Sequence, residues 1–283
     1  MSAAPPTVTA LLPACNAAAF IDETLQSLAA QTYPNLRVLI SVDASTDDTA
    51  ERCERFARGD ARFVVVRQAQ RLGWVGNGQD LLRRAESELC FFISHDDVVE
   101  PEYVAVLVAA LAANRRAALA YCDVDVWGPN GERETSTYPE IDGVAPRFDR
   151  MRVALARNGG WWTAYRGLFR TDVARRGRPL RHNLAGEFAA DWPLLLHFAL
   201  AGDCVRVPRQ LYRKRYRATS VSVVWRYGVL QRVAVGLCCA RVVMEAEFTG
   251  RERAALLAVL ARRVGRDIAV RVRSLARYAL RRA

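Results

Sequence analysis

The chain has 283 residues, 51% of them hydrophobic and 25% charged, and a formal net charge of +11 at pH 7. This is the composition of a globular protein, and the length suits one large domain or two small ones. The longest apolar stretch, Tyr103–Ala113, is shorter than the ~20 residues that cross a bilayer, and the N-terminus lacks the regions of a signal peptide. The basic balance favours phosphate-bearing partners: nucleotides, nucleic acid or an anionic membrane surface.

The seven cysteines are scattered without CxxC spacing, and several lie in apolar runs. We therefore expect reduced, mostly buried thiols and a cytoplasmic protein. None of the three histidines has a partner at ligand spacing, so a zinc site is not expected.

The first half of the chain alternates between apolar runs and helical patterns. The expected elements, in chain order, are a strand at 8–12, a helix at 20–30, a strand at 37–41, a helix that Ser45 or Thr46 caps and that ends at Ala57, a buried strand at 62–67, a helix at 77–85, a strand at 89–93 and a helix at 101–113. This order predicts a parallel sheet with helices on both faces.

Polar residues follow the strands of that sheet. They are residues 13–16 after the first strand, Asp43 after the second, Arg67 and Gln68 after the third, and residues 94–97 after the fourth. Ligands of such sheets bind outside the carboxyl ends of the strands, so we expect these residues to converge on one site.

The second half is less regular. Its expected elements are an alternating strand at 119–127, a hairpin turn at 128–131, a loop-rich stretch at 134–160, a helix at 187–201, a basic and aromatic segment at 206–222 and two helices from about Tyr227 onward.

Four stretches resemble, in this order, the nucleotide-sugar glycosyltransferases of family 2, which have the GT-A fold: LLPACNAAAFIDETLQSLAAQTYPNLRVLISVDASTDDT, RLGWVGNGQDLLRRA, FFISHDDVVEPEY and EFAADWPLLLHFALAG. The resemblance implies an α/β fold with a Rossmann-like, mostly parallel sheet flanked by helices, followed by a C-terminal helical extension. It divides the chain into a nucleotide-sugar-binding half at 1–127, an acceptor-binding half of the same domain at 128–222, and basic amphipathic helices at 223–283.

The same resemblance implies an inverting transfer of a sugar from a nucleoside diphosphate sugar, with a UDP-sugar favoured. The acceptor would be a hydroxyl of a saccharide or lipid-linked saccharide, in cell-surface polysaccharide synthesis. Such a reaction needs a divalent cation at the diphosphate, polar groups around the nucleoside and a carboxylate that takes the proton of the acceptor.

For the cation, the family has two acids separated by one residue, where this chain has Ser94, His95 and Asp96. The resemblance therefore implies Asp96 as the ligand of Mn²⁺ or Mg²⁺, whereas His95 either contacts phosphate or packs. The alternative is that Asp96 and Asp97 only cap the helix that begins near Pro101.

A second acid-x-acid string, Asp123-Val124-Asp125, lies on the alternating strand. It precedes a hairpin, and alternation places both carboxylates on one side. We expect them on a solvated strand face rather than at the cation.

For the nucleoside, the family has an acid at the position of Asp43, against the base or ribose. The other matching residues are Pro13, Ala14, Asn16, Arg71, Gly73 and Asn77. Three of these positions have simpler explanations: Asp43 as a turn residue, Asn16 as a helix cap and Gly73 as a loop glycine.

Asp191 matches the catalytic carboxylate of the family; the glutamate that usually precedes it is absent, and Glu187 could replace it. Asp191 followed by Pro193 is also a good helix start, and one residue can do both. With Asp191, Trp161 and Trp162 suit an acceptor site by stacking on sugar faces, and they suit a hydrophobic core equally well.

Many relatives carry a late histidine that is absent from the segment 212–217 here. Arg213, Arg215 or Arg217 could bind the diphosphate instead, because guanidinium matches phosphate geometry. The alternative is a basic surface.

Residues 251–283 hold ten arginines and two acids. Helical spacing predicts an apolar stripe opposite a basic face; the stripe is Leu257, Leu260, Val264, Ile268, Val272, Leu275 and Ala279, and the face is Arg262, Arg263, Arg266, Arg273, Arg277 and Arg281. One interpretation is that this helix binds an anionic membrane surface, which would place the protein at the inner face of the membrane. The alternatives are that the helix packs on the catalytic domain or that its apolar stripe forms a homodimer.

Other classes of protein remain as alternatives. A sugar nucleotidyltransferase should have a Gly-rich, basic loop after the first strand, and PACNAAAF is neither. A catalytically degenerate scaffold that binds nucleotide or membrane fits the missing acid and histidine, but not the retained Asp43, Asp96 and Asp191. Nucleic acid is not expected as a partner, because much of the excess charge lies in one terminal helix.

Overall fold

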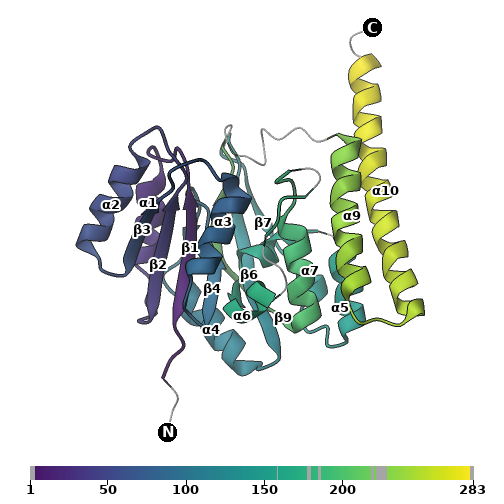
Figure 1. Ribbon diagram of the computed structural model, residues 1–283, viewed down its shortest axis with the longest axis horizontal. Coiled ribbons are helices and arrows are strands. Elements are labelled where there is room, and N and C mark those ends of the chain that lie inside the picture. The colour runs from purple at the N-terminus through teal and green to yellow at the C-terminus, as the bar shows by residue number, and fades with distance from the viewer. Residues whose placement is uncertain are drawn as a thin grey trace.

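The computed structural model describes residues 4–157, 159–176, 180–183, 186–217, 220 and 228–280. One sheet runs through it in the order β3-β2-β1-β4-β8-β6-β9-β5, and β7 pairs with β6 beside this path. Helices flank the sheet, and two long helices stand at the end of the molecule opposite β3 (Figure 1).

The first half confirms the expected alternation of strands and helices. Its elements are β1 (Val8–Ala14), α1 (Ile21–Ala29), β2 (Leu36–Val42), α2 (Thr49–Gly59), β3 (Phe63–Arg67), α3 (Gly73–Arg84), β4 (Leu89–Phe92), β5 (Val98–Val99) and α4 (Tyr103–Ala113). β1 to β4 are parallel to one another, as expected. The expected burial of the third strand is wrong, because β3 forms the edge of the sheet and Val64 is 49% exposed.

The expected cap of α2 is also wrong. The helix begins at Thr49, and the Asp47 carboxylate accepts its N–H at 3.1 Å. Ser45 instead accepts the N–H of Asn16 at 3.1 Å, and Asn16 accepts the N–H of Thr46 at 2.9 Å, so both expected caps join the loop after β1.

The second half makes the sheet mixed. Its elements are β6 (Ala117–Trp127), β7 (Arg133–Ser136), η1 (Pro139–Ile141), α5 (Arg147–Ala156), η2 (Trp161–Arg166), β8 (Leu168–Arg170), α6 (Thr171–Arg176), α7 (Asp191–Ala201) and β9 (Asp203–Arg215). β8 is antiparallel to both β4 and β6, whereas β9 is parallel to β6. α5 lies in the stretch expected to be loop-rich, and Met151, Ala154 and Leu155 bury its inner side.

The solvated face expected for Asp123 and Asp125 is wrong. β6 lies between β8 and β9, so its residues have neighbours on both sides. Asp123 is buried and pairs with Arg206 at 2.7 Å, and Asp125 accepts the indole N–H of Trp127 at 2.6 Å.

The two expected C-terminal helices are present as α9 (Val229–Glu245) and α10 (Gly250–Leu280). They run side by side, and α10 continues beyond α9 (Figure 1). Within the described residues, no helix combines the length and apolar character needed to cross a membrane. The boundary at 222 and the side chains of Leu275, Arg277, Ala279 and Arg281 lie outside the described residues.

Candidate active site

The carboxyl ends of three parallel strands bring many of the expected site residues to one edge of the sheet. Residues 13–16 continue from the end of β1, Asp43 follows β2, and residues 94–97 follow β4. Short contacts join the loops: Asp43 donates its N–H to the carbonyl of Ala14 at 2.8 Å, and Cys15 donates its N–H to His95 Nδ1 at 3.4 Å.

Asp43 fastens the start of α3 to the end of β2. Its buried carboxylate accepts the N–H groups of Leu72 at 2.6 Å and Gly73 at 3.0 Å. Gly73 has a φ of +74°, a left-handed conformation that strains any other residue, and a methyl group there would collide with the carboxylate of Glu187. Glu187 accepts the N–H of Val75 at 3.1 Å, so two carboxylates anchor the first turn of α3.

The other nucleoside residues expected from sequence lie around this anchor at different depths. Asn16 and Arg71 are exposed, and Arg71 donates to Cys15 Sγ at 3.2 Å. Pro13 is half-buried. Asn77 is buried and donates its amide to a carbonyl of β2 at 3.0 Å. The exposed residues can therefore line a ligand, whereas Asn77 supports the edge from below.

His95 is positioned by two contacts. Its Nδ1 accepts the N–H of Cys15, and its ring centroid lies 5.4 Å from that of Phe20. Burial lowers the pKa of His95, although Asp96 and Asp97 act in the opposite direction. The imidazole is therefore neutral near pH 7, with Nδ1 as the acceptor.

Asp96 is 9% exposed, and no side chain in the described ranges donates a hydrogen bond to its carboxylate. Burial, with the charge of Asp97, raises its pKa. The described residues contain no group of three or more His, Cys, Asp or Glu that could hold a metal. A single unpartnered carboxylate at a strand end fits a hard cation that takes its other ligands from substrate phosphate and water.

Asp97 is fully buried at the centre of a charged network. It pairs with Arg166 Nη1 at 3.0 Å and accepts the Tyr212 hydroxyl at 2.8 Å and the N–H of Arg215 at 3.1 Å. Burial alone would raise the pKa of Asp97, but Lys214 and Arg166 outweigh it and lower that pKa. The partners of the Asp97 carboxylate are thus a guanidinium, a tyrosine hydroxyl and the backbone of β9, not the start of a helix.

Arg166 and Lys214 are site residues that the sequence reasoning missed. Arg166 donates to Ser94 Oγ at 2.7 Å. Ser94 is the residue that stands at the position of the family's first acid, so a guanidinium contacts that position here. Lys214 is buried, which lowers its pKa, while the charges of Asp97, Asp96 and Asp191 act to raise it. Alternation along β9 could have revealed Lys214, because its two basic neighbours must point to the other face.

The three arginines expected at the diphosphate lie in two places. Arg213 and Arg215 alternate with Lys214 on β9 and pair with carboxylates on the opposite face: Glu100 at 3.3 Å and Asp125 at 3.6 Å for Arg213, and Glu23 for Arg215. The guanidinium of Arg217 lies 4.4 Å from the ring centroid of Phe20, which packs on the strand-end histidine. Of the three, the structure brings Arg217 next to the strand ends.

Asp191 opens α7 and is half-buried. Burial raises its pKa, and the charges of Arg157 and Arg166 counteract this. The guanidinium of Arg157 lies 4.9 Å from the ring of Trp161 and 4.6 Å from that of Trp192. Asp191 and Trp161 thus belong to one cluster of aromatic and cationic groups.

Glu187 and Trp162 lie elsewhere. Besides its bond to α3, Glu187 lies 3.6 Å from His182 Nε2, so its side chain is engaged away from Asp191 within the part of the chain that the structure describes. Trp162 is half-buried and packs on the apolar cluster around β1 and β2, whereas Trp161 packs on the other core cluster.

A mixed α/β sheet flanked by helices, with carboxylates after its parallel strands, is the architecture of the GT-A fold. The sequence model described as glycosyl transferase family 2 matches residues 9–173, and the chain belongs to this family. EpsH of Bacillus subtilis, named as a glycosyltransferase, is 36% identical over 228 residues, which are 78% of this chain and 64% of EpsH. The chain thus spans less than two thirds of this relative.

Solved structures show the same fold. TarS of S. aureus in complex with UDP-GlcNAc has a TM-score of 0.73 and 18% identity, over 91% of this chain and 72% of that one. The mannosyltransferase PcManGT of Pyrobaculum calidifontis, in complex with GDP-Man and Mn²⁺, has a TM-score of 0.57 and 15% identity, over 98% of this chain and 81% of that one.

Proposed function

We propose that the chain is an inverting glycosyltransferase that moves a sugar from a nucleoside diphosphate sugar to a hydroxyl of a saccharide or lipid-linked saccharide. The observation that carries this proposal is that Arg166, from the second half of the chain, closes on the loop after β4: it pairs with Asp97 at 3.0 Å and donates to Ser94 at 2.7 Å. The UDP-GlcNAc and UDP complexes of TarS favour a UDP-sugar, and the GDP-Man complex of PcManGT makes guanosine the second choice. We place the reaction in the cytoplasm, in cell-surface polysaccharide synthesis.

In the proposed reaction, Asp191 takes the proton of the acceptor hydroxyl while the hydroxyl oxygen attacks the anomeric carbon of the donor. The bond from that carbon to the diphosphate oxygen breaks on the opposite side, and the nucleoside diphosphate leaves with the electron pair. The new glycosidic bond therefore has the inverted configuration. Burial raises the pKa of Asp191, which makes its carboxylate a stronger base than an exposed aspartate.

On the donor side, we assign the nucleoside pocket to Pro13, Ala14, Asn16, Asp43, Arg71 and Gly73, with Asn77 as its support from below, and the diphosphate to His95, Asp96, Arg217, Arg166 and Lys214. A divalent cation, Mn²⁺ or Mg²⁺, would bind at Asp96 and neutralise the charge of the diphosphate. Arg166 and Lys214 would add positive charge from the protein itself. On the acceptor side, Trp161, which lies in the same cluster as Asp191, would stack on the acceptor sugar.

The test is calorimetric titration of UDP, dTDP and GDP and their common sugars, with and without Mn²⁺, against wild type, Asp96→Ala and Asp172→Ala. Asp172 is a matched control, because its carboxylate is 54% exposed and, among the described residues, its ion pair is with Arg176 of the same helix. We expect one nucleotide to bind in a metal-dependent way, and Asp96→Ala but not Asp172→Ala to lose that dependence.

Two outcomes would contradict parts of this proposal. If none of the nucleotides binds, the proposed transferase activity is refuted, and the catalytically degenerate scaffold remains as the explanation of the fold. If the nucleotide binds equally well with and without Mn²⁺, the cation has no role in donor binding, and the basic side chains alone bind the diphosphate.

A further inference from the structure

One side of α9 is apolar and faces away from the core. Leu230 is 81% exposed, Leu237 56% and Met244 55%, and their spacing of seven residues aligns them along the helix. Val233 belongs to the same side. The opposite side of α9 packs on the core through Val235, Cys239, Val242 and Val243. We call the aligned residues 230, 233, 237 and 244 the α9 stripe.

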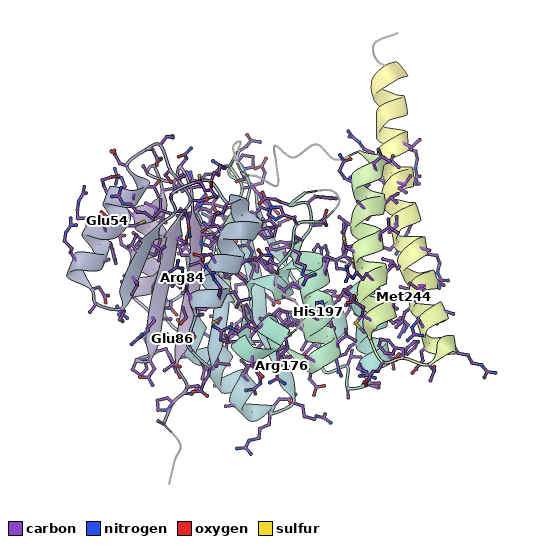
Figure 2. All side chains as sticks on the ribbon, viewed as in Figure 1. Glu54, Arg84, Glu86, Arg176, His197 and Met244 are labelled. Atoms are coloured by element: carbon purple, nitrogen blue, oxygen red, sulfur yellow. The ribbon has the colours of Figure 1, made fainter. Side chains whose placement is uncertain are left out.

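The α9 stripe is unusual within this molecule. Six of the seven large apolar side chains that are exposed among the described residues lie on α9 and α10, and the seventh, Val64, lies on β3. Figure 2 places Met244 on the helical pair at the far end of the molecule. Single exposed apolar residues are ordinary, but an aligned group of them marks a surface that binds a partner molecule or a membrane.

Arginines without an ion pair among the described residues lie on the outer side of α10, the helix that runs next to α9. Arg262, Arg266 and Arg273 are exposed, and no carboxylate in the described part of the chain pairs with them. The Nε atoms of Arg262 and Arg273 donate to carbonyls of their own helix at 3.2 and 3.3 Å, which leaves the outer guanidinium nitrogens for other partners. Both helices bury their inner sides in the same core cluster, so their opposite sides share the outward direction.

A groove lies between α5 and α10, on the arginine side. Its volume is about 590 Å³, and it is lined by Arg152, Arg262 and Arg266 with Glu140 and three small apolar residues: Val153, Ala156 and Val259. Arg152 pairs with Asp149 at 3.4 Å, which leaves the guanidinium groups of Arg262 and Arg266 against the carboxylate of Glu140. Two guanidinium groups above apolar carbon favour an anionic group, which is the chemistry of a phosphate headgroup above an acyl chain.

We infer that the outward face of α9 and α10 binds the surface of an anionic lipid bilayer, with the α9 stripe in the interface and the α10 arginines at the phosphates. The sequence had suggested the apolar stripe of α10 for this contact. Leu257 and Val264 of that stripe instead pack on the core cluster, and Leu260 is buried in it.

Charge decides between a bilayer and a second copy of the chain as the occupant of this face. Each chain has a net charge of +11, and a second copy would bring further free arginines toward the first. An anionic bilayer complements the same charges and accepts the stripe. The binding needs neither donor nor acceptor, so its failure would leave the proposed transferase intact.

The test is co-sedimentation of the full chain with vesicles of phosphatidylcholine, alone or mixed with phosphatidylglycerol. We expect binding to the mixed vesicles that weakens with salt, and much weaker binding to the neutral ones. Leu237→Asn should weaken binding about tenfold and Arg266→Gln about fivefold.

Matched controls come from the other end of the molecule. Val64→Asn changes the one large exposed apolar residue outside the helical pair, and Arg115→Gln changes another exposed arginine without an ion pair in the described residues. Both should bind vesicles as wild type does, and circular dichroism should show that all four variants are folded.

Three results would overturn the inference. These are equal binding to neutral and anionic vesicles, equal losses in the stripe variant and the Val64 control, or no vesicle binding with a dimer in sedimentation velocity that Leu237→Asn dissociates. The last result would assign the face to a second copy of the chain.

Discussion

At the level of single residues, Asp96, Asp97 and Asp191 show how the surroundings of a carboxylate decide what it can do. Burial raises the pKa of Asp96 and of Asp191, whereas two cations lower the pKa of Asp97 despite its complete burial. Asp97 therefore stays ionised and holds Arg166 in place through an ion pair of 3.0 Å. The other two carboxylates remain available for a cation and for a proton.

Asp97→Asn is expected to lower the free energy of unfolding by about 3–5 kcal/mol, because Arg166 would stay buried without its counter-charge. Folding lowers the pKa of Asp97 below its unfolded value of ~3.9. The carboxylate therefore stabilises the fold fully above about pH 3.9, and this stabilisation is lost as the pH falls through the folded pKa. The difference between wild type and variant should therefore shrink in acid. Chemical denaturation at several pH values measures this.

The control for that experiment is Asp172→Asn. Asp172 pairs with Arg176 on the surface, where an ion pair contributes at most about 1 kcal/mol. Equal losses in the two variants would show that the buried network is not what stabilises the fold.

Asp191→Asn is expected to lower kcat by about 10²–10⁴ and to leave donor binding unchanged, because the amide cannot take a proton. Burial raises the pKa of Asp191, and a base must be deprotonated, so kcat of the wild type should fall on the acid side at a pH above ~3.9. Steady-state kinetics and donor titration separate these effects. Asp48→Asn, on the exposed turn before α2, is the control; a loss of donor affinity in Asp191→Asn would argue against the role of base.

At the level of elements, local patterns predicted the first half well because each strand and helix there shows its own periodicity. α5 was missed because Arg147, Asp149 and Arg152 dominate its composition and hide the buried residues between them. The bond from Arg166 to Ser94 joins residues 72 positions apart, and no local pattern contains it. The sequence could thus predict the strand ends and, through the alternation of β9, Lys214, but not Arg166, which the second half folds against them.

The start of α3 offers a test at this level. Gly73→Ala should weaken donor binding about tenfold or more, because the methyl group strains the backbone and displaces Glu187 from the N–H of Val75. Gly143→Ala is a matched control, since Gly143 also has a positive φ, of +67°, but nothing lies within 4 Å of the added carbon. Donor titration and thermal unfolding of both variants would distinguish backbone strain from the collision.

Equal effects on donor binding in the two glycine variants would contradict this account. They would mean that the collision with Glu187 does not matter and that the first turn of α3 tolerates movement.

At the level of the whole molecule, the helical pair reaches the active site through Arg157. Asp267 on α10 lies 3.5 Å from Arg157, and Arg263 donates to the Arg157 carbonyl at 3.0 Å. Arg157 stacks near Trp192 and is the strongest of the charges that lower the pKa of Asp191. A helix that the sequence marked only as a basic tail thus fixes a residue that tunes the proposed base.

This connection predicts a shift in the pH dependence of catalysis. Arg157→Met should raise the pKa of Asp191 further, because it removes a positive charge that favours the ionised carboxylate. The acid limb of kcat should therefore move to higher pH, while donor binding at neutral pH stays unchanged. Asp267→Asn should move the limb less, because Arg157 keeps its charge and loses only a partner.

The control is Arg263→Met. Arg263 contacts both Arg157 and Asp267, but it is not among the main charges that act on the pKa of Asp191. Its pH profile should match that of wild type. If the profile of Arg157→Met also matched wild type, α10 would hold α5 in place without tuning the base, and the helical pair would have to be explained by its outward face alone.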